Sequence, residues 1–189
     1  IRTCAARHVL VVAGEQMSRL IDPADLGTSI IFGDGAGAAV VGPASAGRTG
    51  IGPIVSGSDG SQAGLIACDS AAPGFLRMAG QHVFRWAVEH MPGVAREACR
   101  RAGVALSDID VFVPHQANLR IIDAVARTLG LDNALVADDV TVSGNTSAAS
   151  IPIALTRLIE RRRVRSGHLA LLLGFGAGLA YAGQVVELP

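Results

Sequence analysis

The stretch DIDVFVPHQANLRIIDAVARTLG, residues 108–130, decides the fold class of this sequence. Its opening, residues 108–113, contains the apolar run IDVFV and predicts a buried strand. Asn118 is suited to cap a helix and Gly130 to end it. The apolar residues between them share one helical face, namely Ile121, Ile122, Val125 and Leu129. A strand followed at once by a helix predicts an α/β protein in which helices pack on a sheet.

The segments on both sides continue this alternation. Upstream, apolar residues at helical spacing predict a long amphipathic helix over residues 81–102, which Pro92 can kink. Downstream, a helix is expected after residue 150, with Pro152 tolerated in its first turn. A buried strand is expected at residues 8–13, and a strand, a glycine turn and a second strand are expected within residues 29–42. Further strands are expected at residues 51–58, 169–173 and 179–188. Residues 58–74 are expected to form a loop.

Composition excludes several classes of protein. The 189 residues are 50% hydrophobic and 17% charged, which excludes disorder as the main state. Sixteen basic residues balance sixteen acidic ones and aromatic residues are only 4%, so neither a nucleic-acid platform nor an anionic membrane surface is expected as a partner. Three scattered cysteines favour a reducing cytoplasm over disulfides or a metal site. Residues 169–186 lack charge, but their glycines and alternating apolar residues favour strands over a membrane helix.

Two loops carry polar side chains that are suited to chemistry. His115, in VPHQANLR (113–120), follows a strand and precedes a helix, where a neutral imidazole can donate to an oxyanion or act as acid or base. Alternatively, it is a histidine satisfied at a strand end. Asn145, in SGNTSAAS (143–150), can point N–H donors into a site, or it can form an Asx turn or a helix cap.

A third loop, GFGAG at residues 174–178, lies between two apolar strands. Glycine turns expose backbone N–H groups that can bind an anion or an oxyanion. The loop is not a dinucleotide fingerprint, because its spacing differs and a strand follows where a helix is required.

Four blocks taken together resemble the ketoacyl-acyl-carrier-protein synthase III family of the thiolase superfamily. They are FGDGAG (32–37), VPHQAN (113–118), GNTSAASIP (144–152) and GFGAG (174–178). The resemblance covers essentially the whole chain, and FRWAV and YAGQVVELP are similar to segments of actinobacterial members. It implies a thiolase-like fold of helix, mixed sheet and helix layers. Residues 1–45 are then expected to be the last strands of the N-terminal half, and residues 46–189 the C-terminal half.

The resemblance implies an acyltransferase that condenses an acyl-CoA starter with malonyl-acyl-carrier protein, with loss of carbon dioxide, in fatty acid or polyketide starter synthesis. The family's site uses a Cys, a His and an Asn, and His115 and Asn145 match the last two. Both are expected to donate hydrogen bonds to an enolate oxygen, and the nucleophilic Cys is expected before residue 1. The glycine loop is expected to form a second oxyanion site with the N–H of Ala177, where the family usually has Gly, between Gly176 and Gly178.

Binding positions are also implied by the resemblance. The pantetheine channel is expected to contain Gly80, Gln81, Phe84, Ala117 and Asn118, and the acyl pocket Phe32, Leu76 and Met78. Leu26 stands where many members have an Arg near the CoA phosphates. Arg120 matches a carrier-protein docking Arg, with Arg85 and Arg127 as neighbours, although each can equally be a solvated helix charge. The family implies acyl-CoA as substrate, no tightly bound cofactor, no metal, and a homodimer.

Two alternatives remain open from the sequence. The first is a related enzyme that transfers the acyl group to an alcohol or amine, with His115 as base. The second is a catalytically silent partner subunit, which the missing nucleophile motivates.

Overall fold

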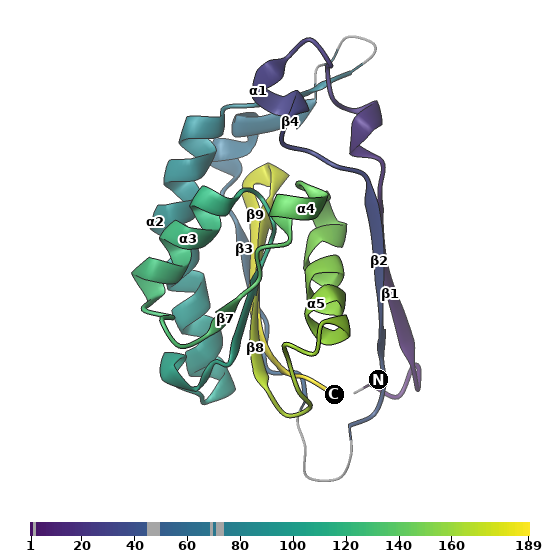
Figure 1. Ribbon diagram of the computed structural model, residues 1–189, viewed down its shortest axis with the longest axis vertical. Coiled ribbons are helices and arrows are strands. Elements are labelled where there is room, and N and C mark those ends of the chain that lie inside the picture. The colour runs from purple at the N-terminus through teal and green to yellow at the C-terminus, as the bar shows by residue number, and fades with distance from the viewer. Residues whose placement is uncertain (2, 45–49, 69, 71–73) are drawn as a thin grey trace.

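The computed structural model describes residues 1, 3–44, 50–68, 70 and 74–189. At its centre is a mixed sheet with the strand order β3–β9–β8–β6–β7 (Figure 1). β6 (Val111–Pro114) is parallel to β7 (Leu135–Val136) and to β8 (Leu169–Gly176). β9 (Ala180–Glu187) is antiparallel both to β8 and to β3 (Val55–Ser58).

Helices cover both faces of this sheet (Figure 1). α2 (Gly80–Ala102) and α3 (Leu119–Leu129) lie on one face, and α5 (Ser150–Glu160) lies on the other. Phe112 of β6 packs in the core under α2 and α3, whereas its neighbours Val111 and Val113 pack in the core under α5. This alternation follows from the two-residue period of a strand. The predicted helix–sheet–helix layers are confirmed.

The helix that follows β6, α3, begins and ends at the predicted residues. Asn118 caps α3 by accepting a hydrogen bond from the N–H of Ile121 at 2.9 Å. Gly130 ends the helix in the left-handed conformation, with φ 69°. α2 continues through Pro92 as one helix of 23 residues, and α5 holds Pro152 in its first turn, as expected.

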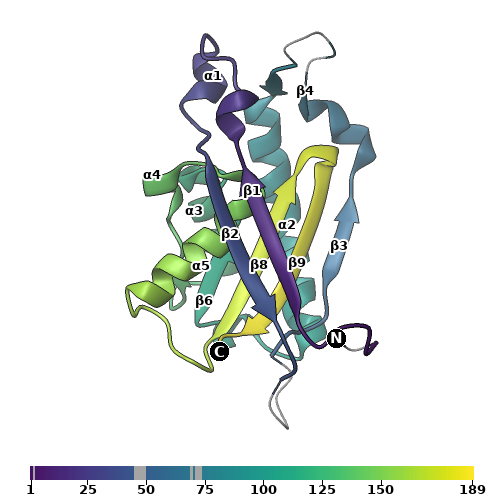
Figure 2. The ribbon, with the colours of Figure 1, turned by 90° about the vertical axis from the view of Figure 1, so that its right-hand side faces the viewer.

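A separate antiparallel hairpin, β1 (Val9–Glu15) with β2 (Gly35–Val41), lies beyond α5 (Figure 2). β2 contacts α5 on the side of the helix that faces away from the sheet. The remaining elements are short: the 3-10 helices Met17–Arg19, Gly60–Leu65, Leu106–Asp108, Ser147–Ala149 and Ala177–Leu179, the helices α1 (Leu26–Ser29) and α4 (Val140–Ser143), and the strands β4 (Ile66–Cys68) and β5 (Leu76–Met78).

Three expectations about local structure are wrong. The strand expected at residues 8–13 is found as β1 at Val9–Glu15, but it is exposed rather than buried, with Leu10 and Val12 at 63% and 64%, because among the described strands it pairs only with β2, outside the central sheet. Residues 29–31 are not a strand, because Asp25 caps the short helix α1 at this point. The expected loop after residue 58 contains a 3-10 helix and strand β4, which pairs with β5. The predicted boundary between residues 45 and 46 lies outside the described residues.

Candidate active site

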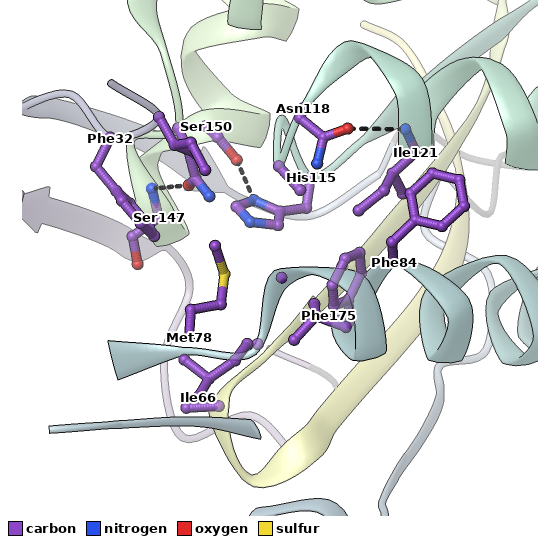
Figure 3. Close-up of a pocket in the computed structure, with 18 of the residues that line it drawn as sticks. Phe32, Ile66, Met78, Phe84, His115, Asn118, Ile121, Ser147, Ser150 and Phe175 are labelled. Carbon is purple, nitrogen blue, oxygen red and sulfur yellow. Dashed lines mark hydrogen bonds between the residues drawn. The ribbon is translucent and has the colours of Figure 1, made fainter. Parts of the chain in front are cut away.

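An open cavity of about 1640 Å³ lies at the carboxyl ends of β6 and β8. Side chains from α2, from the loops that follow β6 and α4, and from the segment before β2 surround it (Figure 3). Most of these side chains are apolar, and a few polar groups converge among them. Ligands of open α/β sheets bind at this end of the strands, so the cavity is the candidate active site.

His115 follows β6 directly, and its backbone is fixed by the sheet. Its N–H donates to the carbonyl oxygen of Leu173 on β8 at 2.7 Å. Its Nδ1 atom lies 2.7 Å from Oγ of Ser150, and the other ring nitrogen lies on the cavity side (Figure 3). Burial lowers the pKa of His115 to about 4, and hydrogen bonding with the Ser147 backbone opposes this only in part. The imidazole is therefore neutral near pH 7, where it can donate one N–H but is a weak base.

Asn145 is buried, and one backbone bond sets the orientation of its carboxamide. The N–H of Ser147 donates to Oδ1 of Asn145 at 2.9 Å (Figure 3). Because the oxygen is held on that side, the amide nitrogen Nδ2 is left for the cavity, and no group among the described residues accepts from it. Ser147 adopts φ 50°, a left-handed conformation that costs a non-glycine residue about 1 kcal/mol. The alternative of an Asx turn is thus realised, and this turn exposes the donor.

The loop around Asn145 is held by the FGDGAG block. Asn145 donates its N–H to the carbonyl of Ile31 at 2.8 Å, and Gly33 donates to the carbonyl of Asn145 at 3.0 Å. A Cβ atom on Gly33 would overlap the carbonyl oxygen of Ser143, and Gly144 needs its positive φ of 68° close to the backbone of Ile31. These glycines therefore permit a close backbone approach that positions a side chain, rather than forming an anion site.

Two buried polar residues, to which the sequence motifs gave no role, support the His115 loop. Gln116 is 1% exposed, and its Nε2 donates to the carbonyls of Pro114 and Ala137 at 2.8 and 3.2 Å. Its Oε1 accepts from the N–H of Val140 at 3.0 Å. Ser150 is also 1% exposed and accepts from the N–H of Gln116 at 3.2 Å. Neither role was predictable locally, because the partners of both residues other than Pro114 lie 21 to 35 positions away.

The glycine loop turns β8 into β9 beside the cavity. Gly176 and Ala177 line the cavity, whereas Gly178, with φ 124°, does not. The end of the loop is fixed by Asp59, which exchanges two backbone hydrogen bonds with Leu179 at 2.9 and 3.1 Å. The Asp59 carboxylate in turn accepts from Nε1 of Trp86 at 3.1 Å, so α2 holds the loop indirectly.

The expected channel residues all line the same cavity: Gly80, Gln81, Phe84, Ala117 and Asn118. Asn118 repeats the arrangement of Asn145. Its Oδ1 accepts from the N–H of Ile121, and none of the described residues accepts from its Nδ2 (Figure 3). The site therefore contains two carboxamides whose oxygens are occupied by the backbone and whose N–H groups are available to a ligand.

The expected pocket residues Phe32, Leu76 and Met78 also line the cavity. Leu76 and Phe32 belong to a small apolar cluster with Met17 and Ile21. Leu26 is 72% exposed and does not line the cavity. This part of the cavity is suited to hydrocarbon.

The three arginines that were expected to dock a carrier protein do not all lie at the cavity. Arg85 and Arg120 line the cavity, whereas Arg127 lies in the last turn of α3, away from it. All three are exposed, and none forms an ion pair with a carboxylate in the described part of the chain. Arg85 and Arg120 are thus free cations at the cavity, as a dock for an acidic partner requires.

Comparison with known proteins assigns this arrangement to a family. Residues 99–188 match the family described as 3-Oxoacyl-[acyl-carrier-protein (ACP)] synthase III C terminal, and residues 1–60 match 3-Oxoacyl-[acyl-carrier-protein (ACP)] synthase III. The chain belongs to the synthase III family. Beta-ketoacyl-[acyl-carrier-protein] synthase III of Streptomyces glaucescens is 49% identical over 196 residues, which cover 98% of this chain and 58% of the relative. A synthase III of Streptomyces coelicolor is 46% identical, and the match covers 100% of this chain and 60% of that relative.

Solved structures of synthase III proteins have the same fold. The enzyme from Thermus thermophilus gives a TM-score of 0.93 at 42% identity, covering 100% of this chain and 61% of that one. The priming β-ketosynthase of the R1128 polyketide pathway gives a TM-score of 0.93 at 48% identity, and the match covers 97% of this chain and 58% of that one. The predicted thiolase-like architecture is confirmed. The chain spans about three fifths of the length of these relatives.

None of the three cysteines of this synthase III chain lines the cavity. Cys4 and Cys68 are exposed, and Cys99 is buried in the core under α2. Burial, and secondarily the Asp108 charge, raises the pKa of the Cys99 thiol, which disfavours a nucleophilic thiolate. Among the described residues, no group of His, Cys, Asp and Glu side chains could hold a metal ion. No helix in that part is long and apolar enough to cross a membrane, and residues 169–186 form β8 and β9 instead.

Proposed function

We propose that the whole protein is a β-ketoacyl-acyl-carrier-protein synthase III, which condenses an acyl-CoA starter with malonyl-acyl-carrier protein. The observation that carries this proposal is the joint arrangement of His115 and Asn145. Both line one cavity, where Nδ1 of His115 pairs with Oγ of Ser150 and Oδ1 of Asn145 accepts from the Ser147 N–H, so each side chain has another nitrogen that can donate to a ligand. Two converging neutral donors are suited to a negative oxygen.

The proposed reaction at these donors begins with decarboxylation of the malonyl group. The bond between the malonyl carboxylate and its α-carbon breaks, carbon dioxide leaves, and the electron pair forms an enolate whose oxygen carries the charge. Nε2–H of His115 and Nδ2–H of Asn145 donate to that oxygen. The α-carbon then attacks an acyl thioester, and a thiolate leaves. No proton has to reach His115, which agrees with its low basicity.

The acyl thioester requires a nucleophilic cysteine. We assign it, as the family resemblance implies, to a segment outside these 189 residues, and the positions of Cys4, Cys68 and Cys99 outside the cavity support this assignment. The second oxyanion, formed when the acyl thioester is attacked, is assigned to the backbone of the glycine loop, with Ala177 N–H as donor. Gly176 and Ala177 reach the cavity and support this assignment.

Substrates and partners follow from the same cavity. Acyl-CoA and the carrier-protein arm would enter past Gly80, Gln81, Phe84, Ala117 and Asn118, and the acyl chain would occupy the apolar region around Phe32, Leu76 and Met78. The acidic carrier protein would dock on Arg120 and Arg85, with Arg127 further along α3. We also propose a cytoplasmic homodimer without a tightly bound cofactor, as the family resemblance implies.

The test is an assay of the complete polypeptide with acyl-CoA and malonyl-acyl-carrier protein. Asn145→Asp keeps Oδ1 for the Ser147 N–H but removes the donor and adds a negative charge, and His115→Ala removes the other donor. Each should lower decarboxylation about 10²–10³-fold. His82→Ala is the matched control, since His82 is exposed and outside the cavity.

Unchanged condensation in either site variant would remove the assigned roles. An ester or amide product without carbon dioxide would replace the proposal with acyl transfer to an alcohol or amine. A complete polypeptide with an intact mass near 19.3 kDa and no activity would identify a silent subunit.

A further inference from the structure

Among the described residues, Ser150 is the polar side chain that forms a hydrogen bond with the His115 ring, at Nδ1 (Figure 3). It is 1% exposed and is the first residue of α5. Its hydroxyl oxygen lies 2.7 Å from Nδ1 of His115 and 3.2 Å from the N–H of Gln116. A buried hydroxyl with two partners can be assigned its donor and acceptor roles by counting protons and lone pairs.

The N–H of Gln116 can only donate, so it occupies a lone pair of the Ser150 oxygen. The hydroxyl proton then needs an acceptor. Within the part of the chain that the structure describes, Nδ1 of His115 is the remaining hydrogen-bond partner of this oxygen. If Nδ1 carried the proton instead, the Ser150 hydroxyl proton would be buried without an acceptor, which is unfavourable.

We infer that Ser150 is a positioning residue that donates its hydroxyl proton to Nδ1 of His115 and thereby keeps the imidazole proton on Nε2, facing the cavity. This inference rests on the proposed function, because only an Nε2–H can donate to the enolate oxygen there. In the other tautomer Nε2 would present a lone pair to the negative oxygen, which is repulsive. Ser150 thus determines whether His115 stabilises or opposes the intermediate.

The helix that carries Ser150 acts in the same direction. α5 has 11 residues, and its N-terminal end lies against the imidazole through Ser150. The partial positive charge at a helix N-terminus disfavours a second proton on the ring. The ring is therefore both neutral and oriented.

The first measurement identifies the tautomer of His115 and does not depend on catalytic activity. In the complete protein labelled with ¹⁵N-histidine, NMR correlations between ring nitrogens and carbon-bound protons identify which nitrogen carries the proton at pH 7. We expect the Nε2–H form of His115 in the wild type and in Ser150→Thr, which keeps the hydroxyl. We expect Ser150→Ala to populate the Nδ1–H form. A wild type with the proton on Nδ1, or Ser150→Ala with the wild-type tautomer, would overturn the inference.

The second measurement is malonyl decarboxylation. Ser150→Ala should lower kcat on the order of tenfold or more with little change in KM, because it weakens one donor to the intermediate. Ser150→Thr should restore most of the rate, and Ser107→Ala, at an exposed serine, is the control. An unchanged kcat in Ser150→Ala would also overturn the inference. A wild type with the expected tautomer but no decarboxylation would overturn the proposed function alone.

Discussion

Gly33 and Asn145 form one backbone pairing, in which the Gly33 N–H donates to the Asn145 carbonyl at 3.0 Å and leaves no room for a side chain on Gly33. The backbone of Asn145, whose amide faces the cavity, is thus fixed by a segment 112 positions earlier in the sequence (145 minus 33). The FGDGAG block therefore holds the Asn145 loop in place, which is its mechanical role.

Gly33→Ala should therefore damage the site through its loop. The new Cβ would overlap the Ser143 carbonyl, and relieving such an overlap costs typically about 1–3 kcal/mol. We expect a lower midpoint in thermal denaturation and a loss of decarboxylation. Gly14→Ala is the control, because a Cβ there meets nothing within 4 Å. Equal effects of the two substitutions would refute the mechanical role.

The low pKa of His115 predicts a pH dependence of stability. Between the ordinary value of 6.5 and about 4, the unfolded chain binds a proton that the folded protein excludes. Stability should therefore fall as the pH is lowered through this window, by about 3 kcal/mol at most from this group. Urea denaturation at several pH values should show a smaller loss in His115→Gln than in the wild type. His82→Gln should keep the wild-type dependence, and an identical curve for His115→Gln would contradict the assignment.

Gln116 is predicted to stabilise the loop that carries His115. Gln116→Ala would leave the carbonyls of Pro114 and Ala137 and the N–H of Val140 without their side-chain partner. Each unpaired buried group costs about 1–3 kcal/mol, although water entering the gap would offset part of the sum. Chemical denaturation should report a loss of several kcal/mol. Gln16→Ala, at an exposed position outside the cavity, should be nearly neutral, and a similarly small effect for Gln116→Ala would show that the loop is held by other contacts.

Asn118 is expected both to cap α3 through Oδ1 and to donate from Nδ2 into the channel, and a substitution that changes only Nδ2 separates these two roles. Asn118→Asp keeps the oxygen that caps α3, so stability should be unchanged within about 0.5 kcal/mol. It removes the N–H₂ donor from the channel, so the KM for acyl-CoA should rise while the fold is preserved. Asn118→Ala loses the cap as well and should cost about 1 kcal/mol. If Asn118→Asp binds acyl-CoA as the wild type does, the residue is a cap only.

The sequence predicted the elements whose signals are local. Asn118 and Gly130 marked the ends of α3 because capping depends on a few neighbouring residues. The wrong strand at residues 29–31 has the converse cause, since Asp25 stabilises one helical turn that is too short to show a periodic pattern. The exposure of β1 could not be predicted, because burial depends on what packs against a strand and not on its own residues.

The candidate site divides in the same way. His115 and Asn145 were recognised from motifs, and the cavity brings them together. Ser150, Gln116 and the pairing between Asp59 and Leu179 were missed, because each acts through a partner distant in sequence. The small residues of SGNTSAAS were a usable signal for close backbone approach. They did not indicate that Ser150 would face the imidazole.

The bridge between Phe32 and Asn145 also makes the amide loop dependent on the N-terminal part of the chain. A polypeptide that began at residue 50 would contain the imidazole, the amide and the glycine turn, yet it would lack the Ile31 and Gly33 groups that hold the amide loop. The amide of Asn145 would then be oriented only after the segment that contains Ile31 and Gly33 packs against its loop.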